Sequence, residues 1–399
     1  MKLDNSRPII GSNAERTKDH NRKAVLGLVK HHQPVGRAEL ARLSGLSTQA
    51  VSNIISELES TGYLVEAGRK IVGRGLPSIQ YTLKRDGGYG LGIEIRPNAM
   101  FAALTNLAGE PCYSKRVSIS DCSPKNASKI AAQLMDDALA HTGIKHDQLL
   151  GAGVVLPGPF GDVGLSGVGD TTLTGWDDTN PKKLFAEALN LPIIVENDAT
   201  AAALAENVGG EAKFLHSYCF VYFGTGLGLG IVVDGKAVRG ANGNAGELGH
   251  IVVQPGGKPC ACGNLGCLET YVSRLSVKAH MALFGITVGN VDDLEKLFND
   301  KHPALMDWLS AAVNPLAQGI SMIENLFDPQ TIIIGGAMPD SILEYLISSL
   351  SLTQASIANI KHRDIPRVQK GTSGRMTAAF GGAALIVHNA FTPGFAPNR

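Results

Sequence analysis

The most specific signal in this sequence is a pair of short segments, which read GELGH at positions 246–250 and CACGNLGCLE at positions 260–269. Together they supply one imidazole and three thiolates at a spacing typical of a closed metal site, from His250, Cys260, Cys262 and Cys267. Soft sulfur ligands with no open coordination position favour a structural Zn²⁺ over a catalytic metal. We therefore expect a structural zinc; the alternative is three reduced thiols in a glycine-rich loop.

A zinc ion here would also orient the residues beside its ligands. Glu247 lies in the first segment and Glu269 ends the second. A loop held by zinc would point both carboxylates into a cleft, so removing the metal should cost ligand binding as well as stability.

On both sides of this motif, strand-like segments alternate with helical ones. Apolar runs at 151–156, 193–196 and 331–334 are typical of strands, and the patterns at 127–141 and 303–326 are typical of helices. This alternation predicts an α/β architecture with two lobes and a cleft.

Length and composition indicate a multidomain protein of the cytoplasm. A chain of 399 residues exceeds what one hydrophobic core usually organises. The sequence contains no apolar run of about 18 residues, as a membrane helix would need, and it starts without a signal-peptide core. We expect no membrane contact.

The N-terminal part has the order of a winged helix-turn-helix. A first helical pattern is followed by a second over 38–43, a break at Gly45 and a third helix that Ser47 can cap. Strands at 63–65 and 79–83 then enclose a glycine-rich basic hairpin.

The formal net charge of zero hides an asymmetry between this part and the rest. Residues 1–86 hold 14 Lys and Arg against 8 Asp and Glu, whereas the remainder holds 22 against 28. A basic head on an acidic body is typical of a segment that meets a polyanion, although a chance imbalance on solvated faces is the alternative.

Side chains of the third helix suit the edges of DNA bases. Short neutral groups occupy its first turns, at Ser47, Thr48, Gln49, Ser52 and Asn53. Gln49 and Asn53 can each bind adenine through two hydrogen bonds. Phosphate contacts are expected from basic residues, namely Arg37, Arg42, Arg69, Lys70 and Arg74. We predict binding to double-stranded DNA; the alternative is a winged helix used for protein contacts.

Nearly the whole chain resembles the ROK family of repressors and sugar kinases. The resemblance rests on the two segments above and on four further motifs, LPGP at 156–159, ENDAT at 196–200, GTGLG at 224–228 and IIGG at 333–336. It implies a two-lobed, actin-like (ribonuclease H-like) ATPase fold of the sugar-kinase type, preceded here by the helix-turn-helix domain.

The resemblance also implies the domain bounds. Residues 1–86 would form the DNA-binding domain, residues 87–197 with 384–399 a first α/β lobe, and residues 198–383 a second lobe with the zinc loop and dimerisation helices.

Five residues match the sugar-contacting positions of the family, namely Asn197, Asp198, Glu247, His250 and Glu269. Carboxylates and an amide that converge on a cleft can bind several vicinal hydroxyls. His250 would bind zinc through one nitrogen and the sugar through the other. In kinases of the family the position of Asp198 is the general base; its alternative role is a helix cap.

The segment that would bind the nucleotide phosphates departs from the family pattern. The first phosphate loop of the family reads Asp-x-Gly-Gly-Thr, whereas this chain has EIRPN at positions 94–98. Arg96 and Pro97 add bulk where a phosphate must approach, and Pro97 lacks an N–H donor. We therefore expect a non-enzyme in which Asp198 is a vestigial base.

The first hypothesis is a sugar-responsive repressor of carbohydrate uptake or catabolism genes. The alternatives are a bifunctional kinase that phosphorylates hexoses with ATP, and a repressor controlled by a protein partner such as a sugar-transport component. We expect a homodimer or a dimer of dimers on a palindromic operator, associated with the nucleoid when bound to DNA. Its ligand would be a sugar or sugar phosphate, and the dimer surface would include helices at 303–326 and 375–390.

Overall fold

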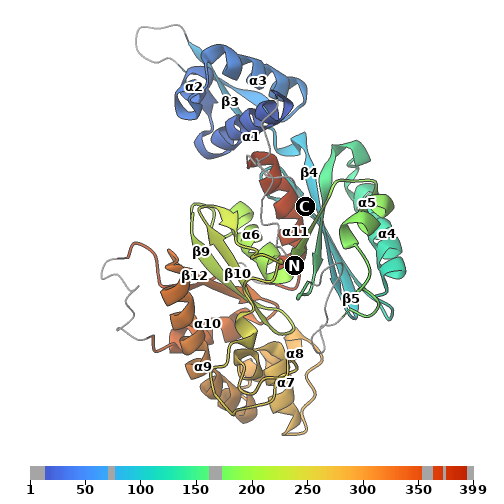
Figure 1. Cartoon of the computed structure of the whole chain (residues 1–399), viewed down its shortest axis with the longest axis vertical. Coiled ribbons are helices and arrows are strands. Elements are labelled where there is room, and N and C mark those ends of the chain that lie inside the picture. Colours follow the sequence, from blue (N-terminus) through green and yellow to red (C-terminus); the bar gives the residue numbers. More distant parts are fainter. Residues whose placement is uncertain (1–13, 71–76, 161–172, 353–362, 372–373, 393–399) are drawn as a thin grey trace, which may run out of the picture. The chain divides into compact units, whose positions relative to one another are not determined.

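The computed structural model describes residues 14–70, 77–160, 173–352, 363–371 and 374–392 (Figure 1). The chain forms a head unit, Met1–Gly88 with Val387–Arg399, and a body unit, Tyr89–Ile386. The finer division of the body into two lobes with the bounds given above stays a prediction. Within the described residues, no helix is long and apolar enough to cross a membrane.

The described part of the head unit contains α1 (Ala14–His32), α2 (Arg37–Ser44), α3 (Thr48–Ser60) and an antiparallel sheet of order β1-β3-β2, with β1 (Val35–Gly36), β2 (Leu64–Lys70) and β3 (Ser78–Leu83). Gly45 ends α2 in the left-handed region, at φ 70°. The hydroxyl of Ser47 accepts a hydrogen bond from the N–H of Ala50 at 3.2 Å, which caps α3. Both the predicted break and the predicted cap are confirmed.

The prediction that the first strand of the hairpin ends near residue 65 was wrong. β2 continues to Lys70, and its pairing with β3 shifts between Glu66 and Arg69. Gly68, at φ 102°, lies in this irregular stretch, so the glycine permits a bulge instead of ending the strand. Arg69 and Lys70 therefore lie on β2.

The first sheet of the body unit has the order β6-β5-β4-β7-β8. Its strands are β4 (Tyr89–Arg96), β5 (Ala99–Asn106), β6 (Pro111–Ser118), β7 (Leu149–Leu156) and β8 (Ile193–Asn197). β4, β7 and β8 are parallel, so their carboxyl ends meet at one edge. One core cluster joins the apolar side chains of this sheet to those of α4 (Pro124–Thr142) and α5 (Pro181–Leu189).

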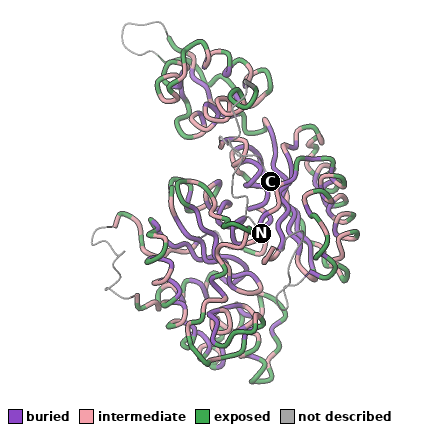
Figure 2. Tube along the Cα trace, viewed as in Figure 1, coloured by how far each residue is buried: buried purple, intermediate pink, exposed green. Residues whose placement is uncertain are grey.

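The second sheet has the order β11-β10-β9-β12-β13. Its strands are β9 (Tyr218–Phe223), β10 (Leu227–Val233), β11 (Lys236–Ala237), β12 (Ile332–Gly336) and β13 (Val368–Lys370). Figure 2 shows that the central strands of both sheets are largely buried, whereas β6 at one edge of the first sheet is mostly exposed. The remaining helices of the body are α6 (Asp198–Gly209), α7 (Arg274–Ala282), α8 (Val291–Asn299), α9 (Pro303–Phe327), α10 (Asp340–Ser349) and α11 (Thr377–Phe391), the last of which ends in the head unit.

In the body unit, α11 packs against the first sheet and α6 with almost no space between the backbones. A Cβ atom on Gly153 of β7 would lie 2.1 Å from the carbonyl oxygen of Gly382, and Gly92 of β4 is equally tight. On α11 itself, a Cβ atom on Gly381 would lie 2.1 Å from the carbonyl oxygen of Ala201 in α6. Only glycine fits at these positions, because any side chain would force the elements apart.

Candidate functional site

The carboxyl ends of the strands in the body unit surround one cavity, which we call the cleft. Residues 94–97 span the end of β4, residues 156–159 span the end of β7, and residues 224–228 contain the turn from β9 into β10. All five sequence-predicted sugar residues line the cleft, namely Asn197, Asp198, Glu247, His250 and Glu269. The structure therefore brings together side chains that are far apart in the sequence.

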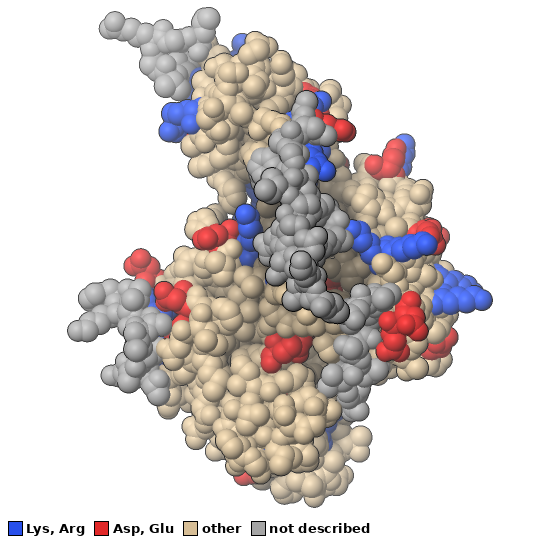
Figure 3. Space-filling view, in the orientation of Figure 1, with Lys and Arg blue, Asp and Glu red and all other residues tan. Residues whose placement is uncertain are grey.

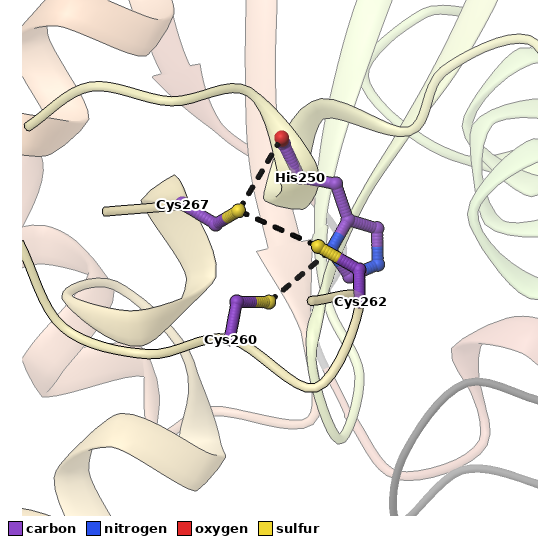
Figure 4. Close-up of side chains that lie close together, drawn as sticks. All are labelled: His250, Cys260, Cys262 and Cys267. Atoms are coloured by element: carbon purple, nitrogen blue, oxygen red, sulfur yellow. Dashed lines mark hydrogen bonds between the residues drawn. The ribbon is translucent and has the colours of Figure 1, made fainter. Parts of the chain in front are cut away.

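The predicted metal ligands form a compact group at one side of the cleft (Figure 4). One ligand atom from each of His250, Cys260, Cys262 and Cys267 lies within 4.8 Å of the others. The loop that carries them is held by short bridges, Val252 to Cys267 and Pro259 to Leu265.

The distances within this group fit a tetrahedral ion. Cys262 Sγ lies 3.6 Å from Cys267 Sγ, and Cys260 Sγ lies 3.5 Å from His250 Nδ1. A zinc ion with bonds of about 2.3 Å to sulfur separates neighbouring sulfurs by roughly 3.8 Å. Three sulfurs and one nitrogen at these spacings could hold a metal ion.

His250 belongs both to the metal-ligand group and to the lining of the cleft. Its Nδ1 is the nitrogen next to Cys260, whereas its Nε2 lies 4.0 Å from Glu247 Oε2. Glu269 contacts the same group, with Oε1 at 3.2 Å from Cys260 Sγ and 3.5 Å from His250 Nδ1. Both predicted carboxylates therefore lie next to the imidazole.

The amino end of α6 provides the other pair of cleft residues. Asn197 is the cap residue, because its Oδ1 accepts from the N–H of Ala199 at 2.9 Å. Asp198 is the first residue of the helix, and its Oδ1 accepts from the same N–H. A Cβ atom on Gly158 would lie 2.9 Å from Asn197 Nδ2 and 3.4 Å from Glu247 Oε1, so the two side chains approach each other there.

Burial changes the acidity of the cleft carboxyls. Burial, and after it the negative charge of Glu94, raise the pKa of Asp198 to about 7, although Arg96 opposes this. Burial also raises the pKa of Glu247. Near neutral pH, Asp198 therefore exchanges between a form that donates and a form that only accepts hydrogen bonds.

Arg96 lies at the end of β4 and is held on three sides. Its Nε donates to Glu94 Oε1 at 2.5 Å, and its Nη2 donates to Tyr222 Oη and to the carbonyl oxygen of Arg375, each at 3.3 Å. The guanidinium also lies 4.6 Å from the ring centroid of Phe101. Sequence reasoning found Glu94 and Arg96 but missed Tyr222 and Arg375.

The predicted DNA-contacting residues of α3 lie together on one helix of the head unit. Ser47, Thr48, Gln49 and Asn53 are exposed, and Ser52 is half-buried. Gln49 Nε2 donates to Asn53 Oδ1 at 3.0 Å, so the two predicted base-reading amides form a pair.

The predicted phosphate-contacting residues differ in how accessible they are. Arg42, Arg69 and Lys70 are exposed, and the head unit shows several Lys and Arg side chains on the face seen in Figure 3. The guanidinium of Arg37 instead lies 5.1 Å from the ring centroid of Tyr81 and 3.6 Å from Glu59. Arg74 lies outside the described residues.

Comparisons with known proteins show which family this chain belongs to. A model of the ROK family matches residues 90–389. The xylose repressor of Bacillus spizizenii is 27% identical over 326 residues, which cover 80% of this chain and 83% of that protein. The glucokinase of Halalkalibacterium halodurans is 35% identical over 224 residues, which cover 52% of this chain and 67% of that protein.

Two solved structures share the fold. A ROK family transcriptional regulator, described as a homolog of the E. coli MLC protein, has a TM-score of 0.72 and 24% identity, covering 94% of this chain and 98% of that one. The ROK hexokinase of Thermus thermophilus has a TM-score of 0.58 and 24% identity, covering 74% and 97%. The predicted sugar-kinase type of fold is therefore confirmed.

Proposed function

The chain belongs to the ROK family, and we propose that it is a sugar-responsive transcriptional repressor of carbohydrate genes that has no kinase activity. The observation that carries this proposal is the contrast between the two ends of the cleft. The sugar side keeps its full set of polar side chains, whereas the position of the first phosphate loop is filled by Arg96 and its partners.

On the sugar side, the five lining residues offer complementary hydrogen-bonding groups. Asn197 Nδ2 donates, and the carboxylates of Glu247 and Glu269 accept. Neighbouring hydroxyls of a sugar need such an alternation of donors and acceptors within a small cavity. Asp198 adds a carboxyl group that can donate or accept a hydrogen bond near neutral pH.

We propose that the Cys₃His group holds a structural zinc ion. The ion would offset two of the three thiolate charges and fix the 246–269 loop. With Nδ1 of His250 on the zinc, Nε2 keeps its proton and donates toward the cleft. Glu247 and Glu269 are then oriented by the same loop.

On the DNA side, the Gln49–Asn53 pair supports base reading by α3. Its internal hydrogen bond fixes both amides before DNA arrives, which reduces the entropy lost on binding. Arg69 and Lys70 on β2 would contact phosphates.

A two-fold homodimer, or a dimer of such dimers, would match a palindromic operator. Of the two helices expected at the dimer surface, we propose α9, where Leu326 near its end is 69% exposed. The expectation for residues 375–390 is wrong, because none of these residues is exposed.

Replacing Asn53 by alanine should reduce sequence reading more than DNA binding in general. We expect Asn53→Ala to weaken binding to a duplex selected from a random pool by roughly 5- to 150-fold, because one good bidentate contact discriminates by about 1–3 kcal/mol. Binding to an unselected duplex at the same salt concentration should change little. Fluorescence anisotropy on both duplexes measures this. Ser56→Ala, an exposed position on the same helix, is the matched control. Equal losses on both duplexes would remove Asn53 from base reading.

Loss of a zinc ligand should harm both stability and sugar binding. We expect Cys262→Ser to lose bound metal and to lower the melting temperature by roughly 5 °C or more, because the loop loses its central constraint. Sugar affinity should fall as well, because Glu247 and His250 lose their positions. Cys112→Ser, outside the metal-ligand group, should keep one zinc per chain by elemental analysis. If Cys262→Ser keeps its sugar affinity, the zinc does not organise the cleft.

Catalysis should be absent. The chain incubated with ATP, Mg²⁺ and a panel of hexoses should form no sugar phosphate, since Arg96 and Pro97 block the approach of a nucleotide phosphate to β4. A coupled assay for ADP measures this, and Asp198→Asn controls for contaminating kinases. Turnover near 1 s⁻¹, ordinary for a kinase, would establish the bifunctional alternative that the glucokinase relative suggests.

A further inference from the structure

One loop of the body unit connects the second sheet to the first. This loop, residues 239–246, follows β11. Its base is closed, because the N–H of Ala245 donates to the carbonyl oxygen of Arg239 at 3.0 Å. At its end, the carbonyl oxygen of Gly246 accepts from the N–H of Leu229 in β10 at 3.0 Å. The two ends of the loop are therefore held together and anchored to the second sheet.

A first contact runs from this loop to β8. Arg239 Nε donates to Glu196 Oε2 at 2.7 Å, and only 3% of the Glu196 side chain is exposed. The other oxygen, Oε1, accepts from the N–H of Asn197 at 3.0 Å. Burial raises the pKa of Glu196 and the charge of Arg239 opposes this, so the arginine favours the ionised form, in which both oxygens accept. One carboxylate therefore links Arg239 to the backbone of Asn197, a predicted sugar residue.

A second contact runs from the loop to the segment after β7. Asn244 Oδ1 accepts from the N–H of Phe160 at 2.7 Å, and Asn244 Nδ2 donates to the carbonyl oxygen of Phe160 at 2.9 Å. Such a reciprocal pair holds the amide in one orientation and satisfies both backbone groups of Phe160. Gly158, two residues earlier, lines the cleft, and a Cβ atom there would lie 2.9 Å from Asn197 Nδ2. Asn244 therefore holds a segment that packs against Asn197.

The two contacts join the halves of the sugar side. Asn197 and Asp198 lie where β8 of the first sheet runs into α6, whereas Glu247 comes directly after the loop that is anchored to the second sheet. A sugar bound by both groups needs them at a fixed separation. A site whose parts are held in place before binding loses less entropy when the ligand arrives.

We propose that Arg239 and Asn244 are positioning residues, which hold the two halves of the sugar side at a fixed separation and so set the affinity of the cleft for a sugar. Neither residue lines the cleft. Arg239 acts through Glu196, and Asn244 acts through the backbone of Phe160. The inference rests on the proposed function in that the ligand is a sugar, and it adds two residues outside the five predicted sugar contacts.

The first test needs no sugar. Hydrogen–deuterium exchange of the full chain, resolved to single amides by fragmentation, measures how well the N–H of Asn197 is held. We expect Arg239→Ala to raise its exchange rate by roughly 2- to 10-fold, the equivalent of one hydrogen bond, because the accepting carboxylate loses its partner. Lys236→Ala, which removes an exposed charge on β11 beside the loop, is the matched control and should leave this rate unchanged.

The second test is isothermal titration calorimetry with D-xylose and D-glucose as the probes. We expect Arg239→Ala and Asn244→Ala each to weaken sugar binding by about 10-fold, the usual effect of losing one well-placed hydrogen-bonding partner. Arg239→Lys keeps a charged donor for Glu196 and should recover most of the affinity. Asn242→Ala, at an exposed asparagine of the same loop, should bind like the wild type.

The outcomes distinguish positioning from a purely structural role. A lower melting temperature with unchanged sugar affinity in both alanine variants would show that the contacts only stabilise the fold, and this result overturns the proposal. Unchanged exchange at Asn197 in Arg239→Ala overturns it as well. If the wild type binds neither sugar, the proposed function fails for these sugars, whereas the exchange experiment still decides whether Arg239 positions Asn197.

Discussion

The close packing of α11 is the constraint on which the rest of the body unit depends. Its backbone touches β4 and β7 at Gly92 and Gly153, and α6 at Ala201, with no room for a side chain. The amino end of α6, where Asn197 and Asp198 lie, directly follows β8 of the first sheet, and α11 holds α6 against that sheet. The second sheet adds its glycine turn from the other side. The glycines therefore allow the close packing of the elements whose ends carry the cleft residues.

Within that cleft, the imidazole of His250 faces two groups. Its Nδ1 lies next to Cys260 and its Nε2 faces Glu247, so a metal ion held by Nδ1 and the cysteines would fix a ring that lines the cleft. The other end of the cleft differs from what a kinase needs. A kinase needs open backbone N–H groups and a metal ion for its nucleotide, whereas this chain has Arg96 and Pro97 at the end of β4. This difference is the basis of our proposal that the cleft holds a ligand without phosphorylating it.

Much of this could be predicted from sequence, because the signals are local. The cysteine spacing indicated the metal-ligand group, and Gly45 with Ser47 indicated the turn between α2 and α3. What escaped prediction depends on long-range contacts. Arg96 bonds to Tyr222 and Arg375, which lie 126 and 279 residues away. Likewise, no local pattern could reveal that Arg37 is held by Tyr81, or that Gly68 accommodates a bulge within β2.

The central claim is that the cleft and the DNA-reading helix belong to one regulated molecule. The most direct measurement takes the sugar or sugar phosphate that most raises the melting temperature and determines operator affinity with and without it, and its own affinity with and without operator. Linkage requires both ratios to be equal, and we predict that each ligand weakens the other by about 5- to 150-fold. If both affinities are unchanged by the other ligand, the chain is not a repressor controlled by that sugar.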